Sequence, residues 1–542
     1  MAGFKRMNRV LLGSVACMAL ASCDGSDSVA SPGEGVVVVP APAPAPSPTP
    51  SPSPTASPTP TGGPAASCPT GTTDVGTIAN TYRSCRVPTT ITSNLTLPQA
   101  QGVAYELNGR VDVGLDVGGA GNIGQAATLT IQPGAVIYAN TATSGTDFLV
   151  VNRGSRLVAD GSAQRPIVFT ALENLTGLNA DGTPFSEEAQ GLWGGVLLLG
   201  RAPIANCATP SGGTAPAGGT VDCQNIAEGQ STAFYGGATA NDDSGVIRYV
   251  QFRYSGVALN NGNELQGLTV AGTGSGTTID HVQVHNSSDD GIEVFGGRTN
   301  FRYLALTGID DDGFDTDVGW QGFAQFVLAI QKPNNSQGDN YSTEIDSNGA
   351  EDSLPRQRYN LANFTFVHTS STTNAAIRLR GGADATFTNG LVRASTAACL
   401  NIIAGATDNG GKSTIRPANP TVDDLGPPVF RSVLFSCPTP YAETAQSGVT
   451  VTIAEQRAVF TTGSSANNNE SAGEIVNGIL PAGAALTATV TNASTINPFF
   501  QATTFVGALS GPNDVNFQGW TCNSNRASFG TSSANCAARP TT

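Results

Sequence analysis

The amino-acid sequence predicts an all-β fold: a single right-handed parallel β-helix with coils of about 20–22 residues, after a disordered Pro-rich N-terminal tether. Alternating apolar and polar residues form short runs separated by Gly or Asn, as in LTIQPGAVIYAN (129–140) and LVVNRGSRLVAD (149–160). These runs align at an interval of 20 residues, and later runs place Val282, Leu304 and Phe326 at intervals of 22. Such periods are typical of stacked coils, and parallel crossovers are almost always right-handed.

Residues 1–22 predict an export signal. Three positive residues precede the apolar run 10–20, which is too short to remain as a membrane span. The run ends in Leu-Ala-Ser-Cys, which resembles the lipobox of bacterial lipoproteins, so Cys23 is the expected lipidation site. An ordinary cleaved signal peptide with a chance Cys is the alternative. Lipidation would anchor the protein in the cell envelope, with the outer membrane as the expected location.

Residues 23–66 predict a disordered linker, because its centre reads PAPAPAPSPTPSPSPTASPTP and alternating Pro cannot join a helix or a sheet. An extended polyproline-like spacer would present the next domain away from the membrane. Beyond it we expect an N-terminal cap over 67–125, the β-helix with loop insertions over 126–522, and a disulfide-closed tail over 523–542.

Eight further cysteines predict four disulfides in an oxidising compartment. In sequential pairs they are 17, 16, 38 and 14 residues apart, so each bond would close a local loop, although the sequence leaves other connectivities open. Zinc is the competing interpretation, but Cys-x-x-Cys does not occur. The eight are Cys68, Cys85, Cys207, Cys223, Cys399, Cys437, Cys522 and Cys536.

The net charge of −15 argues against binding to nucleic acid. Only 12 % of the residues are charged, yet acidic residues crowd into two near-copies of one phrase. Asp-Asp-Gly-Ile-Glu at 289–293 returns as Asp-Asp-Gly-Phe-Asp at 311–315, one period later. Alternation turns Ile292 and Phe314 inward and the neighbouring acids outward. Residues one coil apart stack at about 4.8 Å, so each pair of carboxylates would repel by roughly 3.5 kcal/mol at an effective dielectric of about 20.

Three arrangements would relieve this repulsion. Ca²⁺ would suit it, because Ca²⁺ takes six to eight oxygen ligands in flexible geometry. The two arginines of AIRLRGG, Arg378 and Arg380, would alternatively pair with the acids. Proton sharing, with one pKa raised, is the third arrangement. The following coil adds Asp339, Asn340, Glu344 and Asp346 as further candidates. The expected Ca²⁺ ligands are Asp289, Asp290, Glu293, Asp311, Asp312, Asp315 and Asp317.

Several phrases together resemble a family of bacterial exported β-helix lipoproteins that often occur alongside TonB-dependent outer-membrane receptors. They are NDDSGVIRYV at 241–250, the stretches 267–297 and 311–322, FFQATTFVGAL at 499–509, and Gly-Trp-Thr at 519–521. The resemblance implies a β-helix on the cell envelope and a TonB-dependent receptor as a possible partner.

The function that we expect is a surface binding module that captures a glycan or another ligand with the help of a cation. Trp320 and Tyr303 would offer an aromatic platform, and Arg378 and Arg380 would bind the ligand's acidic groups. The alternative is a Ca²⁺-dependent polysaccharide lyase or glycoside hydrolase, in which Asp311, Asp315, Glu344 and Arg378 are the catalytic candidates.

The sequence lacks the Gly-His-Gly and Arg-Ile-Lys phrases of β-helix hydrolases, which favours binding over catalysis. Its histidines give no further support to an enzyme. His281 and His285 lie on one strand about 13 Å apart, too far to share a zinc ion. We expect His368 to lie on the surface of a coil.

Overall fold

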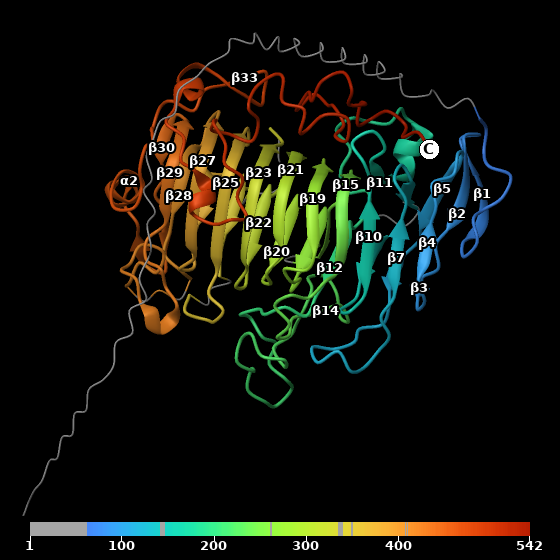
Figure 1. The fold of residues 1–542 in the computed structure, drawn as a ribbon, viewed down its shortest axis with the longest axis horizontal. Coiled ribbons are helices and arrows are strands. Elements are labelled where there is room, and N and C mark those ends of the chain that lie inside the picture. Colours follow the sequence, from blue (N-terminus) through green and yellow to red (C-terminus); the bar gives the residue numbers. More distant parts are fainter. Residues whose placement is uncertain are drawn as a thin grey trace, which may run out of the picture. The chain divides into compact units, whose positions relative to one another are not determined.

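The computed structural model describes residues 62–140, 147–260, 263–333, 340–347, 351–406, 408 and 410–542. The predicted signal peptide, Cys23 and nearly all of the predicted linker lie outside the described residues, as does Asp339. Strands dominate the described chain and stack in parallel along one axis (Figure 1). The prediction of a parallel β-helix is confirmed.

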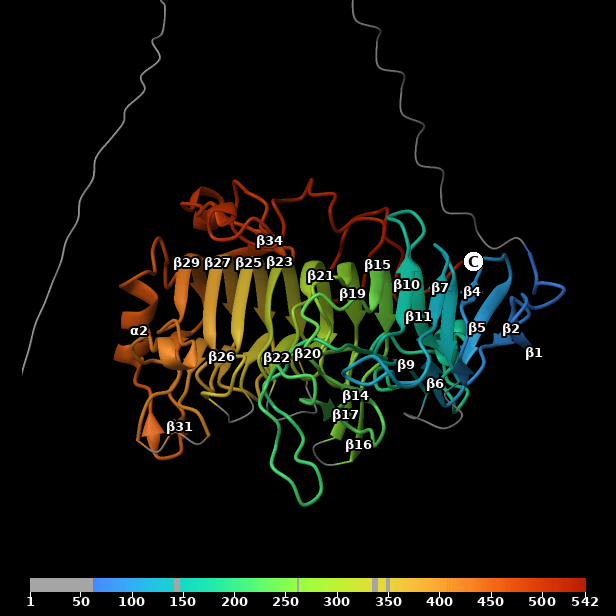
Figure 2. The same ribbon diagram turned by 60° about the horizontal axis from the view of Figure 1, so that its bottom comes forward.

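Two long sheets form the coils (Figures 1 and 2). The first sheet contains β1 (Thr73–Ile78), β2 (Tyr82–Arg86), β4 (Leu95–Leu97), β5 (Val103–Leu107), β7 (Thr128–Ile131), β8 (Val136–Ala139), β10 (Arg156–Asp160), β11 (Ile167–Ala171), β15 (Gly245–Arg253), β19 (Thr278–His285), β21 (Asn300–Ile309), β23 (Gln321–Gln331), β25 (Arg358–His368), β27 (Asp384–Ala394) and β29 (Val429–Ser436). The second sheet contains β3 (Thr90–Ile91), β6 (Arg110–Val113), β9 (Phe148–Val151), β12 (Val196–Leu199), β18 (Leu268–Ala271), β20 (Ile292–Phe295), β22 (Phe314–Asp317), β24 (Thr343–Ile345), β26 (Ala375–Leu379), β28 (Ala398–Ile402) and β30 (Thr439–Tyr441).

The remaining elements are short and lie in connections. Four antiparallel hairpins pair β13 (Asn225–Ile226) with β14 (Phe234–Tyr235), β16 (Val257–Asn260) with β17 (Asn263–Leu265), β31 (Ala445–Gln446) with β32 (Val449–Thr450), and β33 (Ile475–Val476) with β34 (Leu480–Pro481). The helices of the described chain are α1 (Leu172–Thr176), α2 (Ile453–Thr461) and the 3₁₀ turns η1 (Pro420–Val422), η2 (Gly483–Thr487) and η3 (Ala493–Thr495).

Apolar side chains fill the interior of the coils, as the alternation predicts. Ile292, Val294 and Phe314 are fully buried in one continuous core with residues of every long strand. Each buried aliphatic or aromatic side chain contributes about 1.5–3 kcal/mol relative to exposure. The core also takes up Trp193 and Trp320, whose rings lie among Phe169, Phe301 and other aromatic side chains.

Each long strand of the first sheet bends at one residue in the left-handed region, with φ between 51° and 62°. L-residues other than Asn and Asp adopt this region at a cost. Here the cost is offset by stacking, since the Tyr249–His281, His281–Tyr303 and Tyr303–Phe326 ring centroids lie 4.4, 4.3 and 4.7 Å apart. The bend residues are Tyr249, His281, Tyr303, Phe326, Asn363, Asn389 and Ser432.

After β30 the chain turns back and follows the outer face of the first sheet; residues 445–542 are here called the returning segment (Figures 1 and 2). Its amide at Gln501 donates to the Gln325 side chain at 2.8 Å, and further on Cys522 donates to Gln283 at 2.6 Å. At its end, Thr542 accepts from Gly102 at 2.8 Å. The segment therefore spans from the last coils to the first.

Parallel coils therefore occupy a different part of the chain than predicted. Pairing of β2 with β5 already begins inside the range 67–125 that was assigned to a cap, and the last coil ends at β30 instead of near residue 522. Alternation within the returning segment resembled that of coil strands, because a segment that packs on a sheet also buries every second residue.

The predicted period holds in the middle of the helix and fails elsewhere. Thr278 pairs with Asn300 at an interval of 22, but Leu304 pairs with Val327, so Phe326 is displaced by one. Leu129 pairs with Leu157, and Leu149 belongs to the second sheet. The alignment at 20 residues was wrong because strands of both sheets carry the same alternation.

All four predicted disulfides are confirmed in their sequential pairing: Cys68–Cys85, Cys207–Cys223, Cys399–Cys437 and Cys522–Cys536. The second lies in the long connection between β12 and β15, and the fourth lies in the returning segment. No helix in the described part of the chain has the length and apolar character needed to cross a membrane.

Candidate functional site: a buried carboxylate array

Outward-pointing residues of the second sheet form two columns of charged side chains. In the first column, Glu293 pairs with Asp315 in register, and Glu344 on the next coil pairs with Arg378. In the second column, Phe295 pairs with Asp317, and one coil further Asp346 contacts Arg380. The predicted stacking of Glu293 on Asp315 is confirmed.

The turns that lead into β20 and β22 add four more carboxylates. Asp290 accepts a hydrogen bond from the backbone amide of Asp312 at 2.8 Å, and Asp312 accepts one from the amide of Tyr341. Asp289, Asp290, Glu293, Asp311, Asp312, Asp315, Asp317, Glu344 and Asp346 are here called the carboxylate array. Within it, carboxylate oxygens of Asp289, Asp290 and Asp311 lie within 4.8 Å of one another, and so do those of Asp290, Glu293 and Asp315.

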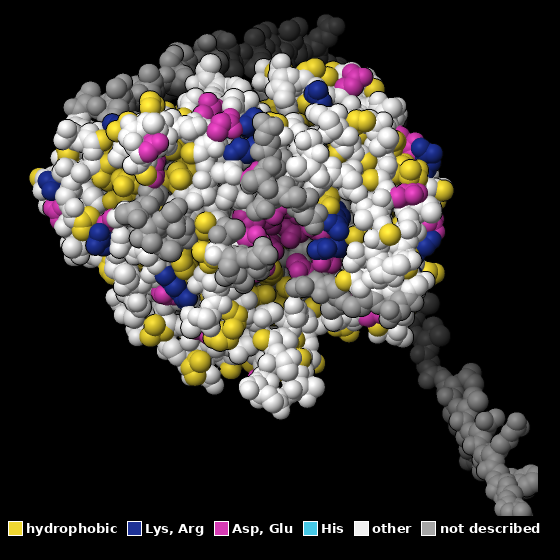
Figure 3. Space-filling model, turned by 180° about the vertical axis from the view of Figure 1, so that it is seen from behind, with side chains coloured by type: hydrophobic (Ala, Val, Ile, Leu, Met, Phe, Trp, Pro, Cys, Tyr) yellow, Lys and Arg dark blue, Asp and Glu magenta, His cyan; other side chains and the backbone are white. Residues whose placement is uncertain are grey.

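Figure 3 shows Asp and Glu side chains gathered at the centre of the face opposite that of Figure 1, with Lys and Arg side chains along one edge. This composition matches the array, in which many acids meet two arginines at one end. The rest of that face carries dispersed charges of both signs (Figure 3).

The array points out of the coil, as predicted, but it is not a solvated surface. Asp289 is 3 % exposed and Glu293 8 % exposed, whereas Asp311 and Asp315 are half-buried. Two connections supply the cover. The connection between β12 and β15 packs Tyr235 against Phe295 with ring centroids 5.9 Å apart, and the next connection carries β16 and β17.

The covering connections bring two acids that sequence reasoning missed, Glu228 and Glu264. Gln266 donates from its side chain to Glu228 at 3.3 Å. Burial, the charge of Glu264 and that hydrogen bond together raise the pKa of Glu228 to about 7. Neither acid belongs to the 22-residue repeat, so no periodic signal in the sequence could have placed it here.

Burial and mutual repulsion act on the whole array. Burial is the main cause that raises the pKa of Asp289 well above its usual range, and the charge of Glu264 adds to it. The pKa of Asp290 is raised by burial and then by Asp312. For Glu293, burial raises the pKa and the charge of Glu228 comes next. Ionised, these groups need a compensating positive charge, because like charges at such separations disfavour each other's ionisation.

Arginines provide that compensation at one end. The Nε atom of Arg380 lies 2.8 Å from Glu344 Oε1 and 3.0 Å from Asp346 Oδ2. Arg378 Nε lies 3.4 Å from Glu344 Oε1, and its Nη1 donates to the Tyr341 hydroxyl at 2.6 Å. The predicted arginine pairing therefore exists, but the described ion pairs reach Glu344 and Asp346 and not Asp289, Asp290 or Glu293.

The predicted aromatic platform of Trp320 and Tyr303 is wrong. Trp320 is fully buried inside the coil, where its indole N–H donates to the carbonyl of Thr299 at 2.9 Å. Tyr303 belongs to the first sheet and packs under the returning segment against Phe517. The aromatic ring that does lie at the array is that of Tyr341, 5.1 Å from the Arg378 guanidinium carbon.

The histidines do not contribute to the array. His281 stacks between Tyr249 and Tyr303 on the first sheet. His285 is fully buried and shares a hydrogen bond of 3.0 Å with the Thr307 hydroxyl. His368 was expected on the surface of a coil and is instead fully buried, with its Nε2 atom 3.1 Å from the Thr373 hydroxyl.

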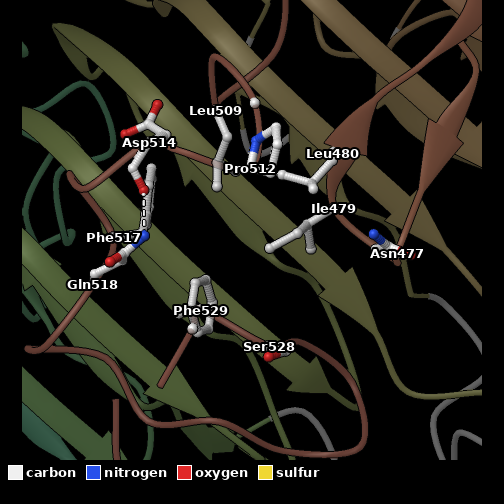
Figure 4. A pocket seen from close by; sticks show the side chains of 12 residues that line it. Asn477, Ile479, Leu480, Leu509, Pro512, Asp514, Phe517, Gln518, Ser528 and Phe529 are labelled. Carbon is white, nitrogen blue, oxygen red and sulfur yellow. Dashed lines mark hydrogen bonds between the residues drawn. The ribbon is translucent and has the colours of Figure 1, made fainter. Parts of the chain in front are cut away.

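A separate cavity of about 300 Å³ lies in the returning segment and is lined by residues between 477 and 530 (Figure 4). Leu480, Leu509 and Phe529 make it largely apolar. The Asp514 carboxylate accepts hydrogen bonds from Ser510 and Asn516, so it is already used to hold the segment's own loop. We therefore assign this cavity to the packing of the segment.

Comparison with known proteins agrees with the architecture. The fold and the array define a parallel β-helix with charged columns on one outer face, and residues 90–425, more than half of the chain, match the family described as a pectate-lyase-like beta helix domain. The chain belongs to this family. No curated protein and no solved structure matches the chain.

Proposed function

We propose that this protein is a cell-envelope binding module that captures an acidic polysaccharide on the outer face of its second sheet, with Ca²⁺ or a similar cation bridging the glycan to the array. The observation that carries the proposal is the composition of the array, in which carboxylates occupy one end and Arg378 and Arg380 the other. Cations held by carboxylates attract uronate groups, and guanidinium groups bind carboxylates in a planar geometry.

The pectate-lyase-like fold supports a polysaccharide-related role, since the family's shared feature is the coil that builds this face. Anchoring through a lipidated Cys23 and cooperation with a TonB-dependent receptor belong to the same proposal. They rest on the lipobox-like quartet and on the family resemblance described above. A lipid-anchored module would hold captured glycan close to the membrane.

Calorimetric titration of the purified full-length protein with polygalacturonate tests the proposal. We expect saturable binding in Ca²⁺, loss of binding in a chelator, and no binding of neutral dextran. Arg380→Gln should weaken binding, whereas Arg156→Gln, which removes an arginine from an exposed ion pair with Asp243 on the first sheet, should not. Absence of binding by acidic glycans in either condition would contradict the proposal.

A second candidate function is a polysaccharide lyase, favoured by the proximity of Arg378 to Glu344 in a pectate-lyase-like fold. A lyase needs a base that removes a sugar proton. Although burial lowers it, the charges of Glu344 and Asp346 raise the pKa of Arg380, which makes this arginine a poor base. Incubation with polygalacturonate tests the candidate, because a lyase leaves an unsaturated, ultraviolet-absorbing end. We expect no such product, and its formation would shift the assignment to an enzyme with Asp311, Asp315, Glu344 and Arg378 in its site.

A further inference from the structure

The acidic end of the array contains two overlapping groups of three carboxylates. The first group consists of Asp289, Asp290 and Asp311, and the second of Asp290, Glu293 and Asp315. In each group the oxygens lie within 4.8 Å of one another. Ca²⁺ binds oxygen at about 2.3–2.6 Å, so two ligands on opposite sides of one ion are at most about 5 Å apart. Each group therefore has the size of one coordination sphere, and Asp290 belongs to both.

Asp289 gives an independent sign that this end lacks a partner. Its Oδ2 atom is buried and has no hydrogen-bond partner among the described residues, although the side chain is only 3 % exposed. A buried carboxylate oxygen without a partner is strongly unfavourable. Protein groups satisfy the comparable acids at the other end of the array, where Arg380 contacts Glu344 and Asp346.

The two groups also differ in their surroundings. Asp289 lies within electrostatic range of Glu264 and Glu228, which come from the covering connections. Asp315 is half-buried and lies within electrostatic range of Arg380. A cation in the first group would join the coil to its covering connections, whereas a cation in the second would face the place where we position the glycan.

We propose that the array holds two divalent cations of the oxygen-preferring class, one in each group, with the Asp290 carboxylate bridging them. The inner cation, at Asp289, is structural, and the outer cation, at Asp315, contacts the ligand. The inference deepens the proposed function and rests on it for the role of the outer cation, but the ion count does not depend on any glycan.

Counting bound Ca²⁺ on the chelated full-length protein tests the inference, by calorimetry together with native mass spectrometry. We expect two ions for the natural protein and one for either Asp289→Asn or Asp315→Asn. Asp290→Asn should impair both steps. Asp160→Asn, which removes an acid from an exposed ion pair on the first sheet, is the matched control and should retain two ions. One ion or none in the natural protein overturns the inference, as does the same remaining step in the Asp289 and Asp315 variants.

A measurement on the natural protein covers the case in which a variant fails to fold. Mn²⁺ is a paramagnetic substitute for Ca²⁺, and two ions bridged by one carboxylate couple magnetically. We expect a coupled-pair spectrum at saturation, whereas a spectrum of isolated Mn²⁺ contradicts a shared Asp290. Two coupled ions without polygalacturonate binding would preserve this inference and reject the proposed glycan. Glycan binding with a single ion would do the reverse.

Discussion

Arg380 places its Nε atom 2.8 Å from the Oε1 atom of Glu344, a residue of the neighbouring coil whose side chain is 10 % exposed. The pair divides the carboxylate array into an end that the protein neutralises itself and an end that it does not. Because both residues occupy outward positions of the second sheet, the division follows from the stacking of β22, β24 and β26.

Arg380→Gln should destabilise the protein. The substitution leaves the mostly buried Glu344 and Asp346 with less compensation, and a hydrogen bond to a charged group contributes about 1.5–3 kcal/mol. We expect a loss at the lower end of that range, because the Arg380 side chain is 31 % exposed and solvent screens part of the interaction. Chemical denaturation in chelator measures it. Arg156→Gln is the control, with a change below about 1 kcal/mol because its ion pair is exposed. Equal effects of the two substitutions would contradict the division of the array.

Much of the array could be predicted because its stacking depends on a short, local repeat. Alternation fixes that Ile292 points inward and Glu293 outward, and the interval of 22 places Glu293 on Asp315. Both inferences need only neighbouring residues and one period, and the structure confirms them.

The cover of the array could not be predicted from the same signals. Glu228 and Glu264 lie in connections without a period, and their approach to the array depends on packing contacts such as that of Tyr235 with Phe295. Trp320 was placed outside because it follows the acidic phrase. The chain turns at Gly319, with φ of 91°, and directs the indole into the core.

Phe314→Ala should destabilise the whole β-helix. The Phe314 ring lies in the core against Phe301, Trp320 and Tyr359, with ring centroids 5.3 to 6.0 Å away. Truncation of a buried Phe costs about 3–5 kcal/mol through lost transfer free energy and the remaining cavity. Urea denaturation followed by tryptophan fluorescence measures the change. Phe234→Ala, at a half-buried ring in the hairpin of β13 and β14, is the control and should cost clearly less. A Phe314 effect no larger than that of Phe234 would show that the stacked aromatic core is not closely packed.

The disulfide Cys522–Cys536 should hold the returning segment on the first sheet. It closes a loop with a sequence separation of 14, and a loop of about 15 residues contributes about 3 kcal/mol in the chain-entropy account. The double substitution to Ser should therefore increase amide exchange around Trp520 and Gln283, where the segment contacts β19. Hydrogen exchange followed by mass spectrometry measures this.

Removal of Cys207–Cys223 is the matched control for the returning segment. This bond closes a loop of similar length, with a separation of 16, in the connection that covers the array. Its loss should increase exchange in that connection and leave Trp520 protected. If both double variants loosened the same region, the two disulfides would not stabilise separate covers.

His285 should make the protein less stable in acid. The imidazole is fully buried, and burial, followed by the charge of Arg253, lowers its pKa from 6.5 to about 3. Because the folded state disfavours the charged form, the stability that this group contributes is fully present above pH 6.5 and is lost as the pH falls toward 3. His285→Gln keeps a hydrogen-bonding group for the Thr307 hydroxyl but cannot acquire a charge. Thermal unfolding of both proteins between pH 7 and pH 4 should therefore show a smaller decrease in Tm for the variant. His281→Gln, on the opposite side of the same bend, is the control. An unchanged pH profile for His285→Gln would assign the acid sensitivity to other groups.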